Sequence, residues 1–165
     1  MPDQSASYKP VALPDYNHVA PEDALRVAQE YLALLKTRHS IRMFARTDVD
    51  QSIIETAIAA AGRAPSGANQ QPWHFVAIKN QEMKKRVREA AEIEEQAFYD
   101  GGGGDEWIRA LEPIGTDPNK PHLTDAPWLI IVFAQRYGLK QDGERYKHYY
   151  VPESVGIATG FLVTA

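Results

Sequence analysis

The chain has 165 residues, of which 44% are hydrophobic and 24% are charged, and its formal net charge is −4 at pH 7. This length suits a single domain with a real hydrophobic core. The acidic balance argues against nucleic acid or an anionic membrane as partner, because either would require a basic face. The chain contains no cysteine, which excludes disulfides, thiolate zinc sites, iron–sulfur clusters and cysteine nucleophiles.

No apolar stretch is long enough to cross a bilayer, and the first residues lack the apolar region of a signal peptide. We therefore expect a protein of the cytoplasm. The histidines show no metal-ligand spacing, so no metal site is expected. Residues 1–21 are rich in proline and are expected to form an extended arm, which leaves residues 22–165 as the folded domain.

Two helices are expected in the first part of the chain. The first begins near Pro21, where the proline and the acids after it suit a first turn, and it runs to Arg38. The second begins at Gln51, where the preceding Asp50 is a suitable N-cap, and its apolar residues recur at helical spacing. Gly62 can end this second helix.

Two strands and two further helices are expected beyond residue 70. Residues 74–79 predict a strand, and residues 81–100 a strongly amphipathic helix. The basic run of this helix, Lys84 to Arg88, is expected to be a solvated face because acids surround it in the sequence. Residues 126–135 are apolar throughout and predict a strand buried on both faces. The last helix, which begins at Pro152, is still apolar where the sequence stops, so we expect a longer protein.

The segment between Tyr99 and Lys120 is rich in glycine and proline. Its first part, Gly101–Gly104, follows a helix instead of a strand, which favours a flexible hinge over a phosphate-binding loop. Little in the segment would hold a fixed structure without a ligand. We therefore expect a lid that becomes ordered over a substrate and excludes water from the site.

Two segments carry residue types suited to binding chemistry. Arg38, Ser40 and Arg42 alternate, so in an extended segment their side chains would share one face. Guanidinium groups beside a hydroxyl suit a phosphate monoester, although an arginine-rich helix end followed by a turn is the ordinary alternative. The second segment, APSGANQQPWHF (residues 64–75), allows close backbone approach through residues 66–68. The two segments together favour a binding site over an ordinary turn.

The segments TRHSIRMF and AAAGRAPSGANQQPWHFVAIKN resemble the flavin-dependent nitroreductase superfamily. The later segments EIEEQAFYD, TDAPWLIIVF and HYYVPESVGIATG resemble its iodotyrosine deiodinase branch, and the similarity extends over residues 24–165. The resemblance implies an FMN enzyme with an α+β fold, a nitroreductase-like three-layer α-β-α sandwich with a central, mostly antiparallel sheet. It also implies an intertwined homodimer with active sites at the interface.

The resemblance assigns eight residues to cofactor binding. They are Arg38, His39, Ser40, Ile41, Arg42, Pro65, Ser66 and Gly67. In this assignment Arg38 and Ser40 lie toward the FMN phosphate, and Arg42 lies toward the edge of the flavin ring. The turn at residues 65–67 lies against the isoalloxazine.

Four residues match the substrate-binding positions of the family. They are Ala68, Glu95, Tyr99 and Lys120. The Ala68 amide is implied to donate to a phenolate oxygen, and the other three to hold the ammonium and carboxylate of a tyrosine-like substrate. Glu95 and Tyr99 are four residues apart on a predicted helix and therefore share a face. Taken one by one, Glu95, Tyr99 and Lys120 also fit ordinary roles: a solvated acid, a rim aromatic and a surface lysine.

The implied activity is FMN-dependent reductive dehalogenation of halogenated tyrosines, in which reduced flavin supplies two electrons and halide is released. NAD(P)H or a separate reductase would reduce the flavin. The hydroxyl donor to flavin N5 is expected beyond Ala165. Two alternatives stay open: a general FMN nitroreductase or quinone reductase that uses NAD(P)H, and a flavin-carrying protein that senses tyrosine-like ligands without turnover.

Overall fold

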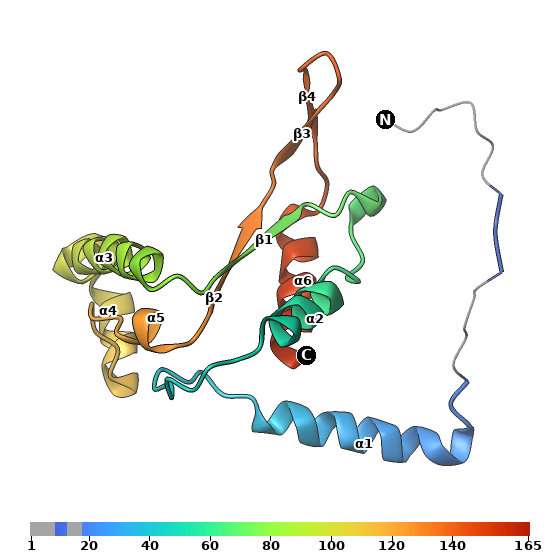
Figure 1. Ribbon diagram of the computed structural model, residues 1–165, viewed down its shortest axis with the longest axis horizontal. Helices are drawn as coiled ribbons and strands as arrows, with labels where there is room; N and C mark the ends of the chain where they lie inside the picture. The colour runs from blue at the N-terminus through green and yellow to red at the C-terminus, as the bar shows by residue number, and fades with distance from the viewer. Residues whose placement is uncertain (1–8, 13–17) are drawn as a thin grey trace.

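The computed structural model describes residues 9–12 and 18–165 of the chain. Most of the predicted N-terminal arm therefore lies outside the described residues, and the division into residues 1–21 and 22–165 stays a prediction. The first helix, α1 (Pro21–Thr37), has none of its residues buried. It lies apart from the other elements at the base of the view in Figure 1. Among the described residues, no helix combines the length and apolar character that a membrane span requires.

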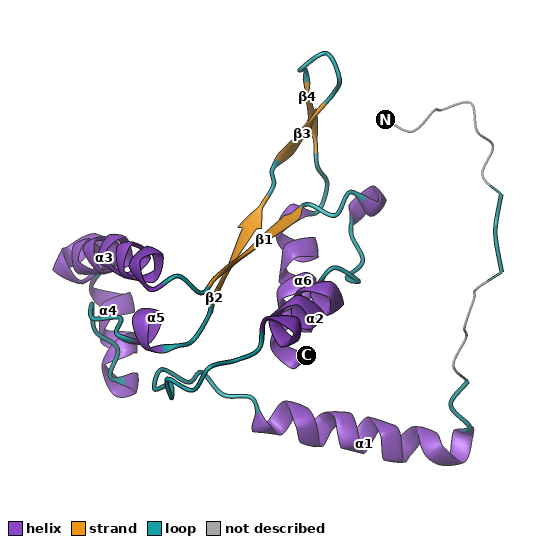
Figure 2. Cartoon of the chain, viewed as in Figure 1, coloured by secondary structure: helices purple, strands orange, loops and turns teal. Residues whose placement is uncertain are grey.

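An antiparallel pair of strands forms the centre of the α+β fold (Figures 1 and 2). Strand β1 (Trp73–Ile78) pairs with β2 (Leu129–Ala134) along its whole length, from Trp73 opposite Ala134 to Ile78 opposite Leu129. Beyond β2 the chain forms a small projecting hairpin of β3 (Tyr137–Leu139) and β4 (Arg145–Lys147). Sequence patterns did not predict this hairpin, because strands of 3 residues are too short to show an alternating pattern.

Two groups of helices surround the strand pair, one beside it and one beyond its end (Figure 1). Helix α2 (Gln51–Ala61) packs against α6 (Val151–Thr164), and α6 in turn contacts both β1 and β2. Helix α3 (Gln81–Ala97) packs against the short helix α5 (His122–Asp125), and both lie beyond the end of the strand pair where β1 stops and β2 begins (Figure 1). Helices and antiparallel strands together form the expected α+β fold.

The predicted ends of α2 are confirmed. The Asp50 carboxylate accepts a hydrogen bond from the Ser52 backbone N–H at 2.8 Å, which satisfies a donor that the first helical turn leaves unpaired. The Gly62 N–H donates to the Ile58 carbonyl and closes the last turn. Ala61 of α2 and Ala158 of α6 are completely buried, since small side chains let the two helices approach closely.

The prediction that residues 126–135 are buried on both faces is wrong for this chain. The strand forms, but its first four residues are only half-buried and its last two are exposed, with 52% of Phe133 accessible. A two-stranded sheet covered mainly by α6 cannot bury both faces of an apolar strand. The apolar run therefore forms a partly exposed apolar surface in the described part of the chain.

The prediction of a fully solvated basic face on α3 is also wrong at one position. Lys84 is buried, with 3% of its surface accessible, and its ammonium donates to the Ala126 carbonyl at 2.6 Å and the Thr124 carbonyl at 3.3 Å. A buried lysine is tolerated because its ammonium is hydrogen-bonded to carbonyls at the end of α5, one of which, that of Thr124, also accepts from the Gln81 side-chain amide at 3.2 Å. Lys84 thus ties α3 to the start of β2.

Helix α3 ends three residues earlier than the sequence predicted. A single π turn, Phe98–Gly102, follows Ala97, and Gly101 adopts a φ of 119° that other residues rarely reach. Tyr99 therefore lies on this turn and not on the α-helix. The glycine run is a local turn, since helix α4 (Asp105–Leu111) begins directly after it.

The segment between Tyr99 and Lys120 contains more fixed structure than predicted. After α4 it forms a 3₁₀ turn at Glu112–Ile114. The Phe98 ring contacts the Trp107 ring edge-to-face, with 5.1 Å between the centroids, and this contact packs α4 against the π turn. An aromatic pair of this kind stabilises local structure that glycine and proline content alone does not predict.

We expect Lys84→Met to lower the free energy of unfolding by about 1–3 kcal/mol, because it leaves the buried Ala126 carbonyl without its donor. Lys85→Met is the matched control. The Lys85 side chain is exposed, so this substitution should change the free energy of unfolding by no more than about 0.5 kcal/mol. Denaturant unfolding of the full-length protein measures both values. Equal effects would show that the Lys84 ammonium has no structural role.

Candidate functional site

The turn between α2 and β1 has an unusual backbone. Ala68, Asn69 and Gln71 have φ angles of 50°, 53° and 49°, in the left-handed region that residues other than glycine seldom occupy. Ser66 holds this conformation: its carbonyl accepts from the Asn69 N–H at 3.0 Å and its hydroxyl accepts from the Gln71 N–H at 2.8 Å. Strained backbone that is held in this way concentrates at ligand-binding sites.

Gly67 allows this turn to pack closely against the start of α6. A Cβ added at Gly67 would lie 2.8 Å from the Tyr149 carbonyl oxygen and 3.0 Å from the Tyr150 ring. The Gly67 N–H points to the buried Ser154 hydroxyl at 3.4 Å. Glycine is therefore required here by space, as expected for a turn where backbone approaches backbone.

Gln70 joins the same turn to the segment between β4 and α6. Its side-chain amide donates to the Lys147 carbonyl at 3.2 Å, and its side-chain oxygen accepts from the Tyr149 N–H at 2.8 Å. Both hydrogen-bonding groups of one side chain are thus used to satisfy backbone groups 77 and 79 residues away. The sequence showed the amide but not its structural role.

The Ala68 backbone N–H has no hydrogen-bond partner within the described part of the chain. Ala68 is exposed, and the neighbouring Pro65 is exposed as well. The turn therefore presents a fixed, unsatisfied donor beside a small side chain. Such a group suits a close approach by an oxygen atom of a ligand.

The segment Arg38–Arg42 follows α1 without regular secondary structure and is fully exposed. It is not the continuous extended segment that the alternation predicted, because the Ile41 N–H donates to the His39 carbonyl at 3.1 Å and turns the chain at Ser40. Within the described residues, neither the Arg38 nor the Arg42 guanidinium forms a hydrogen bond or ion pair. Their guanidinium groups remain available to an anion.

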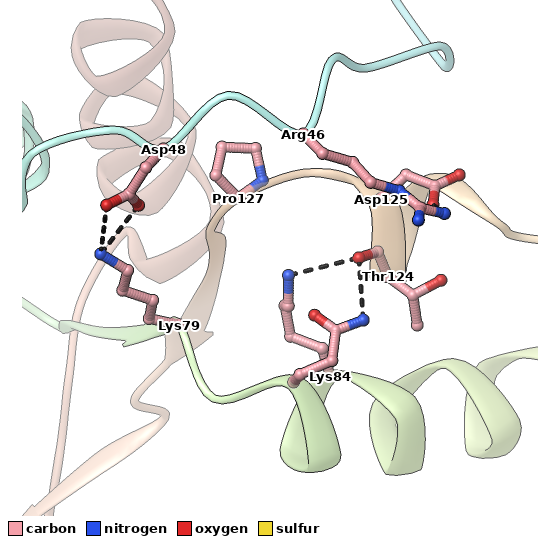
Figure 3. Close-up of a pocket in the computed structure, with 8 residues that line it drawn as sticks. Arg46, Asp48, Lys79, Lys84, Thr124, Asp125 and Pro127 are labelled. Carbon is pink, nitrogen blue, oxygen red and sulfur yellow. Dashed lines mark hydrogen bonds and ion pairs between the residues drawn. The ribbon is translucent and has the colours of Figure 1, made fainter.

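Contacts around a polar pocket fix the chain just after this segment (Figure 3). Lys79, at the end of β1, forms an ion pair with Asp48 at 2.8 Å, and Arg46 forms one with Asp125 at 2.8 Å. Each exposed pair contributes little stability by itself. The half-buried Trp128 indole N–H, which donates to the Val49 carbonyl at 2.9 Å, adds a less solvated link. The acidic and basic side chains of these pairs are therefore bound to one another and not left open for a ligand.

The structure does not bring the two predicted cofactor-binding segments together in one chain. In Figure 1 the segment after α1 lies at the base of the molecule, whereas the turn at residues 65–68 lies beyond the far end of β1. Among the described residues, no hydrogen bond or ion pair connects them.

The structure does bring Glu95 and Lys120 together. The Lys120 ammonium lies 2.8 Å from a Glu95 carboxylate oxygen, and only 15% of the lysine side chain is accessible. Tyr99 lies nearby in sequence, but its hydroxyl bonds to the Thr116 hydroxyl at 2.7 Å. Two of the three predicted zwitterion-binding residues are thus in direct contact, and the third holds the segment that follows α4.

Glu92 belongs to this cluster, although the sequence did not single it out. One of its carboxylate oxygens accepts from the Lys120 backbone N–H at 2.7 Å and from the Arg88 guanidinium at 2.7 Å. The Lys120 N–H, and after it Arg88, hold the pKa of the Glu92 carboxyl below its usual range. The only signal in the sequence was the i, i+4 spacing of Arg88 and Glu92 within an acid-rich run.

His122 lies at the start of α5, two residues after Lys120. Burial lowers the pKa of His122, and the positive charges of Lys120, Arg42 and Arg88 lower it further. The neutral imidazole of His122 is therefore favoured.

We expect Gln70→Ala to lower the free energy of unfolding by about 1–2 kcal/mol, because it leaves two backbone groups without partners. Gln71→Ala is the control: this exposed side chain makes one long contact with Asn69, at 3.4 Å, and its loss should cost less than about 0.5 kcal/mol. Denaturant unfolding of both variants measures the difference. A harmless Gln70→Ala would mean that the turn is held by other contacts.

Comparisons with known proteins agree on one family. The nitroreductase family model matches residues 35–165. The chain is 43% identical to an iodotyrosine deiodinase of Haliscomenobacter hydrossis over 145 residues, which are 88% of this chain and 65% of that protein. It is 41% identical to an iodotyrosine deiodinase of Daphnia pulex over 150 residues, 91% of this chain and 50% of that protein. The chain thus spans between half and two thirds of these relatives.

A solved structure supports the same assignment. The oxidized iodotyrosine deiodinase bound to FMN and 3-iodo-L-tyrosine superposes with a TM-score of 0.70 at 28% sequence identity. The similarity covers 81% of this chain and 67% of that one. With the family model matched over most of the sequence, the chain belongs to the nitroreductase family.

Proposed function

We propose that the full-length protein is an FMN-dependent reductive dehalogenase of halogenated tyrosines. The observation that carries this proposal is the contact between Glu95 and Lys120, one carboxylate and one ammonium at 2.8 Å. An amino-acid substrate presents one ammonium and one carboxylate, so its site requires one group of each sign. The similarity to iodotyrosine deiodinases supports the same substrate class.

The residues of the chain fit an FMN group in chemical type. Arg38 and Arg42 offer unpaired guanidinium groups beside the Ser40 hydroxyl, and these suit a phosphate. The strained turn at residues 65–67 offers close backbone approach, which suits a flat ring. FMN, when bound, would supply the two electrons of the reaction. NAD(P)H or a separate reductase is proposed as the source of those electrons.

The protein residues would position and desolvate the substrate. Glu95 would bind its ammonium, Lys120 its carboxylate, and Tyr99 would contribute a hydroxyl from the same lid. The unpaired Ala68 N–H would hold the phenol oxygen as phenolate, since a donor favours the charged form. The segment between Tyr99 and Lys120, once closed, would exclude water from the ring.

A homodimer would bring these parts into one site. In a single chain the turn at residues 65–68 lies far from the segment after α1 (Figure 1). Large apolar side chains on α1, α6 and β2 are exposed, including Leu25 at 68%, Phe161 at 42% and Phe133 at 52%. Exposed apolar surface of this kind is typical of a face that a second copy covers.

We expect the purified full-length protein to release FMN, and not FAD, on denaturation. Arg38→Ala should weaken FMN retention by about 1.5–3 kcal/mol, the usual scale of a charge-assisted hydrogen bond. Lys36→Ala is the control, because it removes an exposed positive charge two residues earlier, at the end of α1. Equilibrium dialysis followed by flavin absorbance measures retention. A colourless protein that FMN cannot reconstitute would refute the cofactor assignment.

We expect Glu95→Gln and Lys120→Ala each to lower kcat/KM for iodotyrosine. The loss of transition-state stabilisation should be about 1.5–3 kcal/mol for each variant. Activity on a simple nitroaromatic should change little, because that substrate has no ammonium or carboxylate. Glu94→Gln is the matched control, since Glu94 is exposed on the same helix. Steady-state kinetics with both substrates, on wild type and all three variants, measure the effects.

The same kinetics separate the rival functions. Parallel losses on iodotyrosine and the nitroaromatic would make Glu95 and Lys120 structural and would favour a general FMN nitroreductase or quinone reductase. Tight iodotyrosine binding without turnover, with reduced flavin present, would favour a ligand sensor. Neither outcome is expected from the dehalogenase proposal.

A further inference from the structure

We propose that Glu92 is a positioning residue of the substrate site: its carboxylate holds the Lys120 backbone and thereby orients the Lys120 ammonium toward the substrate. This inference rests on the proposed function, because it takes Lys120 as the group that binds the substrate carboxylate. Glu92 itself touches neither substrate nor cofactor in this assignment.

The hydrogen bond that carries the inference is short and charge-assisted. Glu92 Oε1 accepts from the Lys120 backbone N–H at 2.7 Å, with 28% of the glutamate side chain accessible. A carboxylate bound to a backbone N–H forms a stronger link than two neutral groups do. Because the contact is to the main chain, it fixes the position of the whole residue and leaves the ammonium free to exchange partners.

Lys120 has few other means of staying in place. It follows Pro118 and Asn119 in a stretch without regular structure, just before α5. Among the described residues, the Glu92 bond is the only hydrogen bond that ties the backbone of residues 115–121 to α3. The remaining backbone bonds of this stretch are local, such as that from the Asn119 N–H to Asp117 at 2.7 Å.

Glu92 and Glu95 hold the same lysine at two points. They are three residues apart on α3 and therefore lie on one face of the helix. Glu92 binds the lysine backbone, whereas Glu95 binds its ammonium at 2.8 Å. When a substrate ammonium takes Glu95, the Lys120 ammonium loses that carboxylate and keeps only the Asp117 carbonyl of its own loop, at 2.6 Å, whereas the Lys120 backbone keeps its bond to α3. Glu92 thus keeps Lys120 in position during the exchange of charges that substrate binding requires.

Arg88 orients the Glu92 carboxylate from one helical turn away. Its guanidinium donates to Glu92 Oε1 at 2.7 Å and to the Thr124 hydroxyl at 3.2 Å. The guanidinium therefore links α3 to α5. With both partners fixed, the oxygen that accepts from Lys120 has little freedom to move away.

The test compares Glu92→Ala with Glu92→Gln in the full-length, FMN-loaded protein. Iodotyrosine carries the zwitterion and iodophenol does not, so the ratio of their KM values reports how well Lys120 is placed. Glu92→Ala should raise the KM for iodotyrosine about tenfold or more, the scale of a lost charge-assisted hydrogen bond, and leave that for iodophenol unchanged. Glu92→Gln keeps an oxygen acceptor and should restore most of the loss.

Glu89→Ala is the matched control, because Glu89 is exposed one turn earlier and makes only a 3.9 Å contact with Lys85. Should Glu92→Ala fail to fold, Glu92→Asp serves in its place, because the shorter side chain withdraws the acceptor and the same rise in KM is expected. Retained FMN absorbance and an unchanged melting temperature show that a variant is folded.

Three results would overturn the inference. An unchanged iodotyrosine KM in Glu92→Ala, with a raised KM in Glu95→Gln, would show that the zwitterion site works without Glu92. Parallel losses on iodotyrosine and iodophenol would show that Glu92 only stabilises the fold. A wild type that binds iodotyrosine no better than iodophenol would refute the zwitterion assignment of the proposed function, and the role of Glu92 with it.

Discussion

The antiparallel register of β1 and β2 determines where every candidate functional group lies. Trp73 pairs with Ala134 at one end and Ile78 with Leu129 at the other. At the first end, the strained turn before β1 meets the segment that leads into α6. At the second end, β1 leads into α3, and α5 leads into β2. These two helices are therefore held side by side. A slip of this register would separate Glu92 and Glu95 from Lys120.

Because the strand pair separates these two regions, one chain presents two partial sites. One offers close backbone approach and an unpaired N–H, and the other offers the Glu95–Lys120 cation–anion pair. Neither is a closed cavity that would enclose a ligand. The exposed apolar side chains of α1, β2 and α6 are consistent with a second copy that completes the sites, and their energetic cost in water is the reason to expect one.

The charged network on α3 shows how the same residue types serve different purposes. Lys84 is buried and satisfies carbonyls at the end of α5, whereas Lys85 beside it is solvated. Glu92 is half-buried and holds a backbone N–H, whereas Glu94 is exposed. The difference follows from the helical period: residues separated by three, four, seven or eight positions face α5 and the segment before it, and their neighbours face water.

The sequence by itself determined the local elements: the capped α2, the strand β1, the existence of α3 and α6, and the resemblance that names the candidate residues. These follow from short-range causes, because capping, periodicity and turn chemistry act within a few residues. Only the tertiary structure decided which members of a charge run are buried, that β2 is half-exposed, and that Glu92 holds Lys120. Such outcomes depend on which residue 28 or 42 positions away supplies the partner, and no local pattern encodes that choice.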